Sequence, residues 1–367
     1  MRYQEFRQVL KESAKVGREY QHLEDLVFVD GSAGAVEAAD ILDGLGTDAS
    51  DVAIKWDGNP TVYFGREPDG TFVLVGKNGW GRNMSTSSKD LANFIKQSGK
   101  GVEEEPWREE FGNNMADIFE IVKANFPQNF EGYVYGDLLY SPSKPFTTSK
   151  QGIQFTPNKV TYTVNPNSEI GKRIAQSKVG VTVHNRFDSF GSKSGVPVDD
   201  VADLNSKDVM VIGQSYVAHQ PSVDTSETDS IRKFAKANAR AIDTFLAPQK
   251  GMADLKQIIY KFVNTMSKAQ RFDSINSKGF FDWLKTSTVS NPKQQKIYQL
   301  YQANSAGMDS MFKLVNRIMT VKNHIIDQLD DAPADVKAST GDAPGGEGYV
   351  AQRSKTKLVP RHRWTPN

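Results

Sequence analysis

A lysine at the end of an apolar run is the first residue of the chain that could do covalent chemistry. Lys55 follows the run 52–54 and precedes Trp56, Asp57 and Gly58, so that the four residues give the pattern Lys-x-Asp-Gly. An amine held where a strand enters a glycine-permitted turn can attack a phosphorus atom when desolvation or a neighbouring cation keeps it unprotonated. The same pattern also describes an ordinary strand end with a solvated lysine and an Asp-Gly turn. The rest of the chain has to decide between these two interpretations.

Further acids and cations follow at the predicted turns and strand ends. In chain order they are Lys77, Glu131, Asp137, Glu347, Lys355 and Lys357. Taken singly, each has an ordinary explanation as a turn, a strand end or a solvated face. Taken in order, they supply what nucleotidyl transfer needs, namely a lysine nucleophile, carboxylates that hold ribose hydroxyls and a divalent metal, and late lysines that neutralise phosphate charge.

This order resembles the motif order of the covalent nucleotidyltransferases, the superfamily of ATP-dependent RNA and DNA ligases and mRNA capping enzymes. Residues 55–58 are similar to motif I, whose lysine becomes adenylylated or guanylylated. Residues 77–79 are similar to the Arg-Asn-Gly turn that many ligases carry next. Residues 135–138 are similar to motif III, and residues 160–164 to the aromatic strand of motif IIIa.

Two C-terminal stretches extend the resemblance. Residues 347–350 are similar to motif IV, and residues 355–358 to the Lys-x-Lys of motif V. The closest group is the RNA ligases of bacteriophage type, because the lead-in at residues 22–26 and the ending are also similar to uncharacterised phage proteins. The similar stretches are scattered and cover well under half of the chain.

The resemblance implies an ATP-dependent polynucleotide ligase, most similar to RNA ligases, in which Lys55 forms lysyl-AMP and 5′-phosphate ends are joined to 3′-hydroxyl ends. It implies ATP with Mg²⁺ or Mn²⁺, held by Asp137 and Glu347, and a nucleic acid partner that is RNA or a nicked duplex. Tyr162 would either stack on the base or belong to the hydrophobic core. The other residues implied in nucleotide binding are Ile54, Asp57, Gly58, Lys77, Lys355 and Lys357. A DNA ligase, a GTP-using capping-type enzyme and an inactive nucleic-acid-binding protein are the alternatives.

The chain departs from the family pattern in several places. Asp137 stands where motif III commonly has glutamate, and the sequence Glu-Gly-Tyr-Val occurs both at Glu131 and at Glu347. Glu131 is therefore an alternative motif III acid, although the glycine before Asp137 favours Asp137. The gap between Glu347 and Lys355 is short, and few residues follow motif V. The prediction is a fold without a C-terminal OB domain.

The elements predicted around these residues belong to the α+β class. Short β-branched or aromatic runs at residues 52–54, 61–64 and 71–75 predict an antiparallel meander with Lys55 in its first strand or turn. Further strands are predicted at residues 26–31, 132–135, 160–164 and 180–183, and helices at residues 6–14, 35–42, 90–97 and 114–126. Together with the resemblance, this predicts an antiparallel-sheet nucleotidyltransferase core of the ATP-grasp-like ligase type.

The second half of the chain is predominantly helical. Apolar residues keep helical spacing over residues 231–245 and 308–329. This predicts an all-α domain inserted at residues 223–333, between a core at residues 1–222 and a return to the core at residues 334–367. Cations of the insert belong either to a face that binds a nucleic acid backbone or to solvated helix faces, and they are Lys233, Lys236, Arg240, Lys256, Lys261, Lys268, Arg271 and Lys285.

Composition excludes several other functions. The 367 residues include 45 basic and 44 acidic side chains, so the chain lacks the overall positive charge that would indicate nucleic acid binding. The absence of cysteine excludes disulfides, thiolate metal sites and cysteine nucleophiles. The five histidines show no metal-ligand spacing, and His184 is predicted to be structural. No signal sequence or apolar run of about 20 residues occurs, which predicts a cytoplasmic protein, in the host cytoplasm if a phage encodes it.

Overall fold

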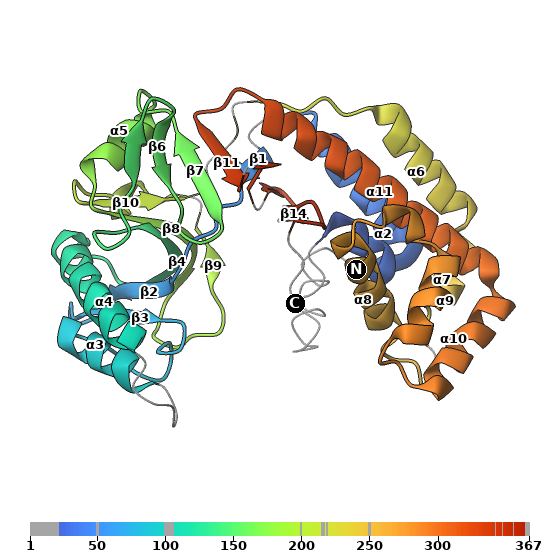
Figure 1. Ribbon diagram of the computed structural model, residues 1–367, viewed down its shortest axis with the longest axis horizontal. Helices are drawn as coiled ribbons and strands as arrows, with labels where there is room; N and C mark the ends of the chain where they lie inside the picture. Colours follow the sequence, from blue (N-terminus) through green and yellow to red (C-terminus); the bar gives the residue numbers. More distant parts are fainter. Residues whose placement is uncertain are drawn as a thin grey trace. The chain divides into compact units, whose positions relative to one another are not determined.

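The computed structural model of the protein describes residues 22–48, 51–98, 106–198, 200–213, 217, 219–248, 251–341, 343–346, 348–354 and 356–363. The helix predicted at residues 6–14 lies outside these residues. The chain divides into two compact units (Figure 1). Unit 1 comprises residues 1–54, 216–332 and 347–367, and unit 2 comprises residues 55–215 and 333–346.

The larger sheet of unit 2 has the strand order β10-β8-β4-β2-β3, with β9 paired to β8. Its strands are β2 (Thr61–Arg66), β3 (Phe72–Gly76), β4 (Gly132–Tyr140), β8 (Val179–Phe187), β9 (Val196–Pro197) and β10 (Val209–Ile212). Only β8 and β10 are parallel neighbours. The helices α3 (Ser88–Gln97) and α4 (Pro106–Asn125) cover one face (Figure 1), where Phe64 and Val134 belong to one core with Phe119 of α4.

A second, antiparallel sheet completes unit 2, with the strand order β12-β11-β7-β6-β5. Its strands are β5 (Thr147–Ser149), β6 (Gly152–Phe155), β7 (Val160–Val164), β11 (Val336–Thr340) and β12 (Ala343–Pro344). The short helices α5 (Glu169–Gln176) and η3 (Ala202–Leu204) connect strands of the unit. A strand that precedes the helical block in the chain and one that follows it therefore meet here, because β11 pairs along β7.

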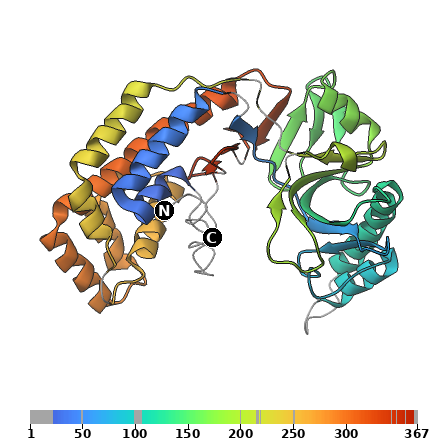
Figure 2. The same ribbon diagram turned by 180° about the vertical axis from the view of Figure 1, so that it is seen from behind.

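Unit 1 is mostly helical. Its helices are η1 (Leu23–Asp25), α2 (Leu26–Leu45), α6 (Thr225–Ala237), α7 (Ala239–Leu246), α8 (Leu255–Lys268), η4 (Phe272–Ser274), α9 (Ser277–Thr286), α10 (Asn291–Ala303) and α11 (Ser305–Asp331). The helices α2, α6 and α11 lie side by side (Figure 2). A small antiparallel sheet of order β1-β13-β14 shares their core, with β1 (Val52–Ile54), β13 (Tyr349–Ala351) and β14 (Thr356–Leu358).

The strand predicted at residues 26–31 is wrong, because these residues form the first turns of α2. Leu26, Val27 and Phe28 are buried within the helical core. In such a short apolar run, the spacing of hydrophobic residues is the same for a buried strand and for a buried helix, so the sequence does not distinguish them. The helix kinks at Gly31, which has a φ of 60°. Asp243 of α7 then accepts hydrogen bonds of 2.8 Å from both the backbone N–H and the hydroxyl of Ser32, so the helix restarts with a cap from another part of the chain.

The domain boundaries also differ from those predicted. The helical block at residues 223–333 does not stand apart as an insert, because α2 from the N-terminal region and β13 and β14 from the C-terminal region belong to the same hydrophobic core. Conversely, residues 333–346 leave the helices and join unit 2 through β11. The α+β class is confirmed. Among the described residues, no helix is long and apolar enough to span a membrane.

A buried ionic cluster ties the separate parts of unit 1 together. Lys322 of α11 donates to both carboxylate oxygens of Glu24, at 3.0 and 2.7 Å, and the Nε of Arg361 donates to Glu24 at 2.8 Å. Arg361 also pairs with Asp25, and His22 lies beside them. Exposure of Glu24, Lys322 and Arg361 is 1% or less. Two carboxylates thus face two cations, a balance that a protonated His22 would upset.

His22 is expected to lower the free energy of unfolding as the pH drops below about 6.5. Burial, followed by the charges of Arg361 and Lys322, lowers the pKa of His22 well below its ordinary value. As the pH falls, His22 therefore binds a proton in the unfolded chain but not in the folded chain. The free energy of unfolding then decreases by up to about 1.4 kcal/mol per pH unit. Urea denaturation between pH 5 and 7.5 should show a flatter pH dependence for His22→Gln. Equal slopes for both proteins would contradict the prediction. Burial raises the pKa of Asp25 to about 6. Because Asp25 is present in both proteins, its titration does not account for a difference between their slopes.

Candidate active site

The segment of residues 55–60 is fixed to both sheets of unit 2. The backbone N–H of Asp57 donates to the hydroxyl of Tyr162 in β7 at 2.7 Å, and the backbone N–H of Asn59 donates to the carbonyl of Leu138 in β4 at 2.9 Å. Asn158, in the turn between β6 and β7, donates to the Asp57 carboxylate. Lys55 is the first residue of unit 2, and the position of the segment that follows it is set by these bonds.

Gly58 is required by a close approach to β4. A Cβ atom at this position would lie 2.5 Å from the carbonyl oxygen of Leu138 and 2.8 Å from the Cβ of Asp137, distances that real Cβ atoms do not adopt. An ordinary Asp-Gly turn needs glycine for its backbone angles, whereas here glycine lets one chain segment touch another. The glycine of the Lys-x-Asp-Gly pattern therefore stands directly against Asp137.

Asp137 is partly buried, and its carboxylate makes two hydrogen bonds. Its Oδ1 accepts the hydroxyl hydrogen of Thr61 at 2.6 Å, and its Oδ2 lies 2.9 Å from the Nε2 of His184. The strand register explains both contacts, because Asp137 pairs with Thr61 of β2 and with Thr182 of β8, and a bulge brings His184 alongside. These bonds hold the carboxylate in one orientation, and its remaining lone pairs can still accept a donor or a cation.

The sequence-based interpretation of His184 missed this contact. The signal was a single imidazole directly after the mostly apolar run 179–183, on the strand β8 that neighbours Asp137. Arg186, which follows closely in the sequence, is exposed and lies 4.3 Å from the ring centre of Phe130, a residue of the core that α4 covers. The pairing of His184 with Asp137 depends on sheet order and a bulge, which a single sequence does not reveal.

The two acids proposed for motif III lie far apart, one before β4 and one within it. Glu131 is exposed and directly precedes the strand, six residues before Asp137, which corresponds to about 20 Å of extended chain. Of these two acids, Asp137 is the one that touches the segment of residues 55–60. Lys77 is exposed and directly follows β3. The pairs Thr61↔Asp137 and Val62↔Gly76 put Lys77 at the same end of the sheet as Asp137, about two strand spacings away.

The predicted role of Tyr162 needs correction. Its side chain is fully buried, and its ring lies between Trp56, at 4.6 Å between centroids, and Phe155, at 5.5 Å. No ring face is left for a nucleobase to stack on. Burial raises the pKa of the Tyr162 phenol, so its hydroxyl stays protonated and positions Asp57. The indole N–H of the buried Trp56 has no acceptor among the described residues, and it is a donor that a ligand oxygen or a water could use.

Two further predicted residues, Ile54 and Lys357, belong to unit 1. Ile54 pairs with Tyr349 in the small sheet, and Lys357 of β14 pairs with Val350 and forms a bridge to His22. Glu347 and Lys355 lie outside the described residues, so the predicted motif IV acid and the first motif V lysine have no described position. Within unit 2, the structure thus groups Asp57, Gly58 and Asp137, with Lys55 next to them in sequence.

Asp137 has lone pairs that could serve as ligands to a divalent cation. No cluster of three or more histidine, aspartate or glutamate side chains able to hold a metal occurs in the described part of the chain. Mg²⁺ commonly takes one or two carboxylates and completes its octahedron with phosphates and waters. Asp137 could supply such a carboxylate.

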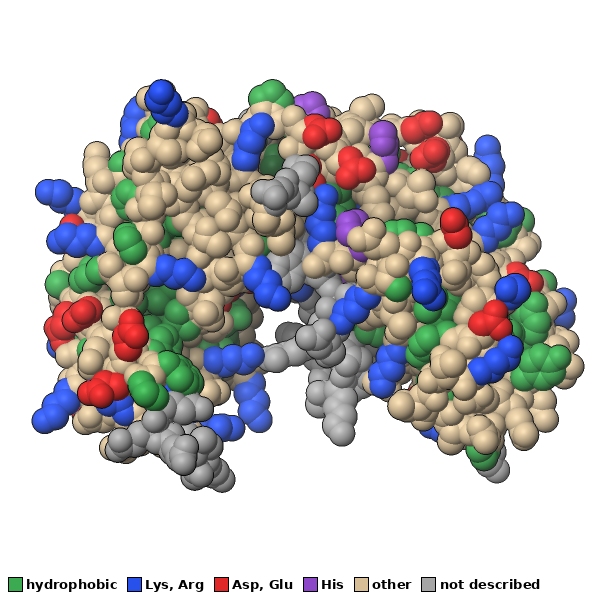
Figure 3. Space-filling view, in the orientation of Figure 1, with side chains coloured by type: hydrophobic (Ala, Val, Ile, Leu, Met, Phe, Trp, Pro, Cys, Tyr) green, Lys and Arg blue, Asp and Glu red, His purple; other side chains and the backbone are tan. Residues whose placement is uncertain are grey.

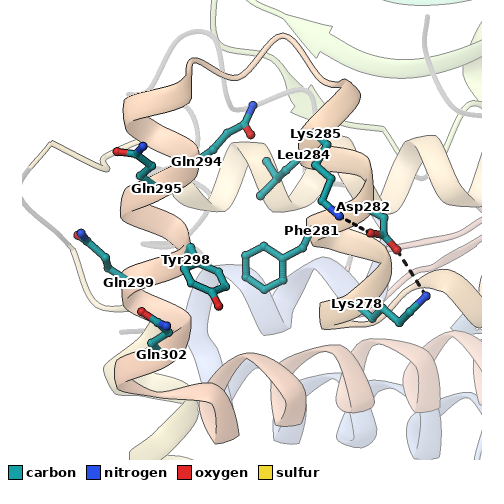
Figure 4. A pocket seen from close by; sticks show the side chains of 10 residues that line it. All are labelled: Lys278, Phe281, Asp282, Leu284, Lys285, Gln294, Gln295, Tyr298, Gln299 and Gln302. Atoms are coloured by element: carbon teal, nitrogen blue, oxygen red, sulfur yellow. Dashed lines mark hydrogen bonds and ion pairs between the residues drawn. The ribbon is translucent and has the colours of Figure 1, made fainter.

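A separate hollow of about 630 Å³ lies in unit 1 between α9 and α10 (Figure 4). Phe281 and Tyr298 face each other across it, and Asp282 pairs with Lys285 at 2.9 Å and with Lys278 at 3.5 Å. Its charges are therefore paired within the hollow, and none of the predicted motif residues lines it. On the face shown in Figure 3, Lys and Arg side chains are interspersed with Asp and Glu, in agreement with the net charge of +1.

Comparison with known proteins gives one match. A family model described as a family of unknown function (DUF6267) matches residues 19–366. No curated protein and no solved structure matches the chain.

Proposed function

The chain belongs to the family of unknown function DUF6267, and we propose that it acts as an ATP-dependent polynucleotide ligase of the RNA-ligase type. The observation that carries the proposal is the close approach of Gly58 to Asp137. It joins the two parts of the chain that resemble motifs I and III, although about 80 residues separate them, and it does so within one compact unit. Nucleotidyl transfer uses this combination of a lysine amine and carboxylates.

The proposed first step is attack by the Nζ of Lys55 on the α-phosphorus of ATP. A nitrogen–phosphorus bond forms, the bond from the α-phosphorus to the bridging oxygen breaks, pyrophosphate leaves, and the amine loses a proton to solvent. The AMP group then passes from Lys55 to the 5′-phosphate of a polynucleotide. Attack by a 3′-hydroxyl on that phosphate releases AMP and leaves a phosphodiester.

Asp137 and Asp57 are assigned to positioning. The bonds from Thr61 and His184 fix the Asp137 carboxylate where a ribose hydroxyl or a nucleotide-borne Mg²⁺ can meet it. A bound Mg²⁺ would offset the charge that develops on the phosphate oxygens. Lys77, at the same end of the sheet, is assigned to phosphate.

The test uses the full chain with ATP that carries the label either on its α- or on its γ-phosphate, in the presence of Mg²⁺. We expect a covalent adduct that retains the α-label only, survives denaturation and is lost on acid treatment, as a phosphoramidate should be. Parallel incubation with α-labelled GTP separates a ligase from a capping-type enzyme. The absence of any adduct with ATP and with GTP would overturn the proposal.

Asp137→Asn is expected to lower the rate of adduct formation about 100-fold, whereas Glu131→Gln should leave it within about twofold. Each change removes one charge from β4 or its edge, but only Asp137 touches the segment that follows Lys55. Single-turnover labelling of the two variants measures the difference. A larger loss for Glu131→Gln than for Asp137→Asn would assign the essential acid to Glu131.

A further inference from the structure

The turn between β6 and β7 presents one side-chain amide to the segment that follows Lys55. Asn158, in this turn, donates a hydrogen bond from its Nδ2 to the carboxylate of Asp57. Its Oδ1 accepts hydrogen bonds from the backbone N–H of Lys159 and, at 3.0 Å, from that of Val160. The two ends of the amide therefore do different things, because the oxygen holds the turn and the nitrogen holds Asp57.

Further bonds fix the turn itself. The Nζ of Lys144 donates to the carbonyl of Pro157 at 2.6 Å, and the hydroxyls of Thr156 and Thr161 lie 2.9 Å apart across the turn. The side chain of Asn158 is half-buried between these contacts and Asp57. A group that has to hold another in place to within about 0.5 Å needs support of this kind from its own surroundings.

The second sheet holds the two residues after the proposed nucleophile through three side chains. Tyr162 of β7 accepts the backbone N–H of Asp57 at 2.7 Å, and the rings of Tyr162 and Phe155 pack against Trp56. Asn158 adds the hold on the Asp57 carboxylate. The two residues that follow lie against β4 of the larger sheet instead. Loss of the Asn158 amide would therefore release the Asp57 side chain and leave the aromatic packing in place.

We propose that Asn158 is a positioning residue for the reaction at Lys55, because its amide holds the Asp57 carboxylate and so fixes the backbone two residues after the amine. This inference rests on the proposed function. Asparagine suits the place, since its short side chain accepts with one arm and donates with the other without carrying a charge. An aspartate would meet Asp57 with a like charge. Displacement of a reacting group by about 1 Å can slow a reaction about 100-fold.

Asn165 provides a matched control at the other end of β7. Its Oδ1 accepts the backbone N–H of Asn167 at 3.0 Å, and its Nδ2 donates to the carboxylate of Asp335 at 2.9 Å. The two asparagines thus make the same kinds of bond on either side of one strand. Asn158 reaches the segment of residues 55–60, whereas Asn165 reaches the residue before β11. A general role in holding the ends of β7 would make both side chains equally important.

The first test compares Asn158→Ala with Asn165→Ala in single-turnover labelling of the full chain, over a range of ATP concentrations and with Mg²⁺. At saturating ATP, Asn158→Ala should lower the rate constant of adduct formation at least about tenfold. The ATP concentration that gives half of the maximal rate should stay within about threefold, because the lost contact is made to the chain and not to ATP. Asn165→Ala should label as the native chain does. Loss of folded protein would lower the labelled fraction rather than the rate constant.

Hydrogen exchange of the peptide that covers residues 55–60 gives a readout that does not depend on activity. Asn158→Ala should speed this exchange at least about tenfold, because a hydrogen bond to a charged group contributes about that factor. Asn158→Ser keeps a side-chain oxygen for the turn and loses the amide, so it should have the same effect. Asn165→Ala should leave the exchange unchanged.

Unchanged exchange of residues 55–60 in both Asn158 variants would overturn the inference. Equal slowing of labelling by Asn158→Ala and Asn165→Ala would also overturn it, while an adduct on the native chain would leave the proposed function standing. Absence of any adduct on the native chain would reject the proposed function, and with it a part for Asn158 in that reaction. Faster exchange in Asn158→Ala would in that case still show that Asn158 holds the segment.

Discussion

Replacing Lys55 with arginine is expected to abolish the covalent AMP adduct, a loss of at least about a thousandfold. Arginine keeps a positive charge and a similar length, but its guanidinium stays protonated and cannot attack phosphorus. The adduct is measured by retained α-label and by a mass increase of one AMP. Lys55 begins unit 2 at a segment held by Asp57 and Gly58, so the local fold should persist in the variant.

The matched control is Lys150→Arg, which makes the same change on an exposed turn between β5 and β6. This variant should label as the native chain does. Equal labelling of Lys55→Arg and Lys150→Arg would show that Lys55 is not the nucleophile, even if the protein forms an adduct elsewhere. Peptide mapping would then locate the modified side chain.

Glu24→Gln is expected to destabilise unit 1 by about 3–5 kcal/mol. Burial acts to raise the pKa of Glu24, but the charges of Lys322 and Arg361 outweigh it and hold that pKa well below its ordinary value. Removing this carboxylate leaves Lys322 fully buried with its main ionic partner gone. Urea denaturation followed by helical circular dichroism measures the loss, because the long helices α2 and α11 belong to unit 1.

Two comparisons sharpen this prediction. Glu169→Gln removes one partner of a solvent-exposed pair, in which Lys172 lies at 3.1 Å, and should cost at most about 0.5 kcal/mol. Glu24→Gln/Lys322→Met removes both buried charges and should recover part of the stability lost in Glu24→Gln. A double variant less stable than Glu24→Gln would show that Lys322 stabilises the fold without Glu24.

Part of the fold followed from local pattern alone. The β-branched run of β7 and the helical stripe of α11 were predicted at nearly their observed positions, because alternation and a 3.6-residue period are properties of neighbouring residues. The apolar start of α2 was predicted as a strand instead, since burial on all sides erases the period. The division into two units also escaped prediction, because it depends on which apolar faces meet across more than 200 residues.

The candidate site divides in the same way. The sequence by itself determined which residue types are present, and their order was enough to single out Lys55, Asp57 and Asp137. Only the tertiary structure decided that Gly58 touches Asp137, that His184 completes its hydrogen bonds, and that Tyr162 is core. These facts depend on strand order, register and a bulge, which are set by packing between distant segments and leave no trace in the spacing of residues along the chain.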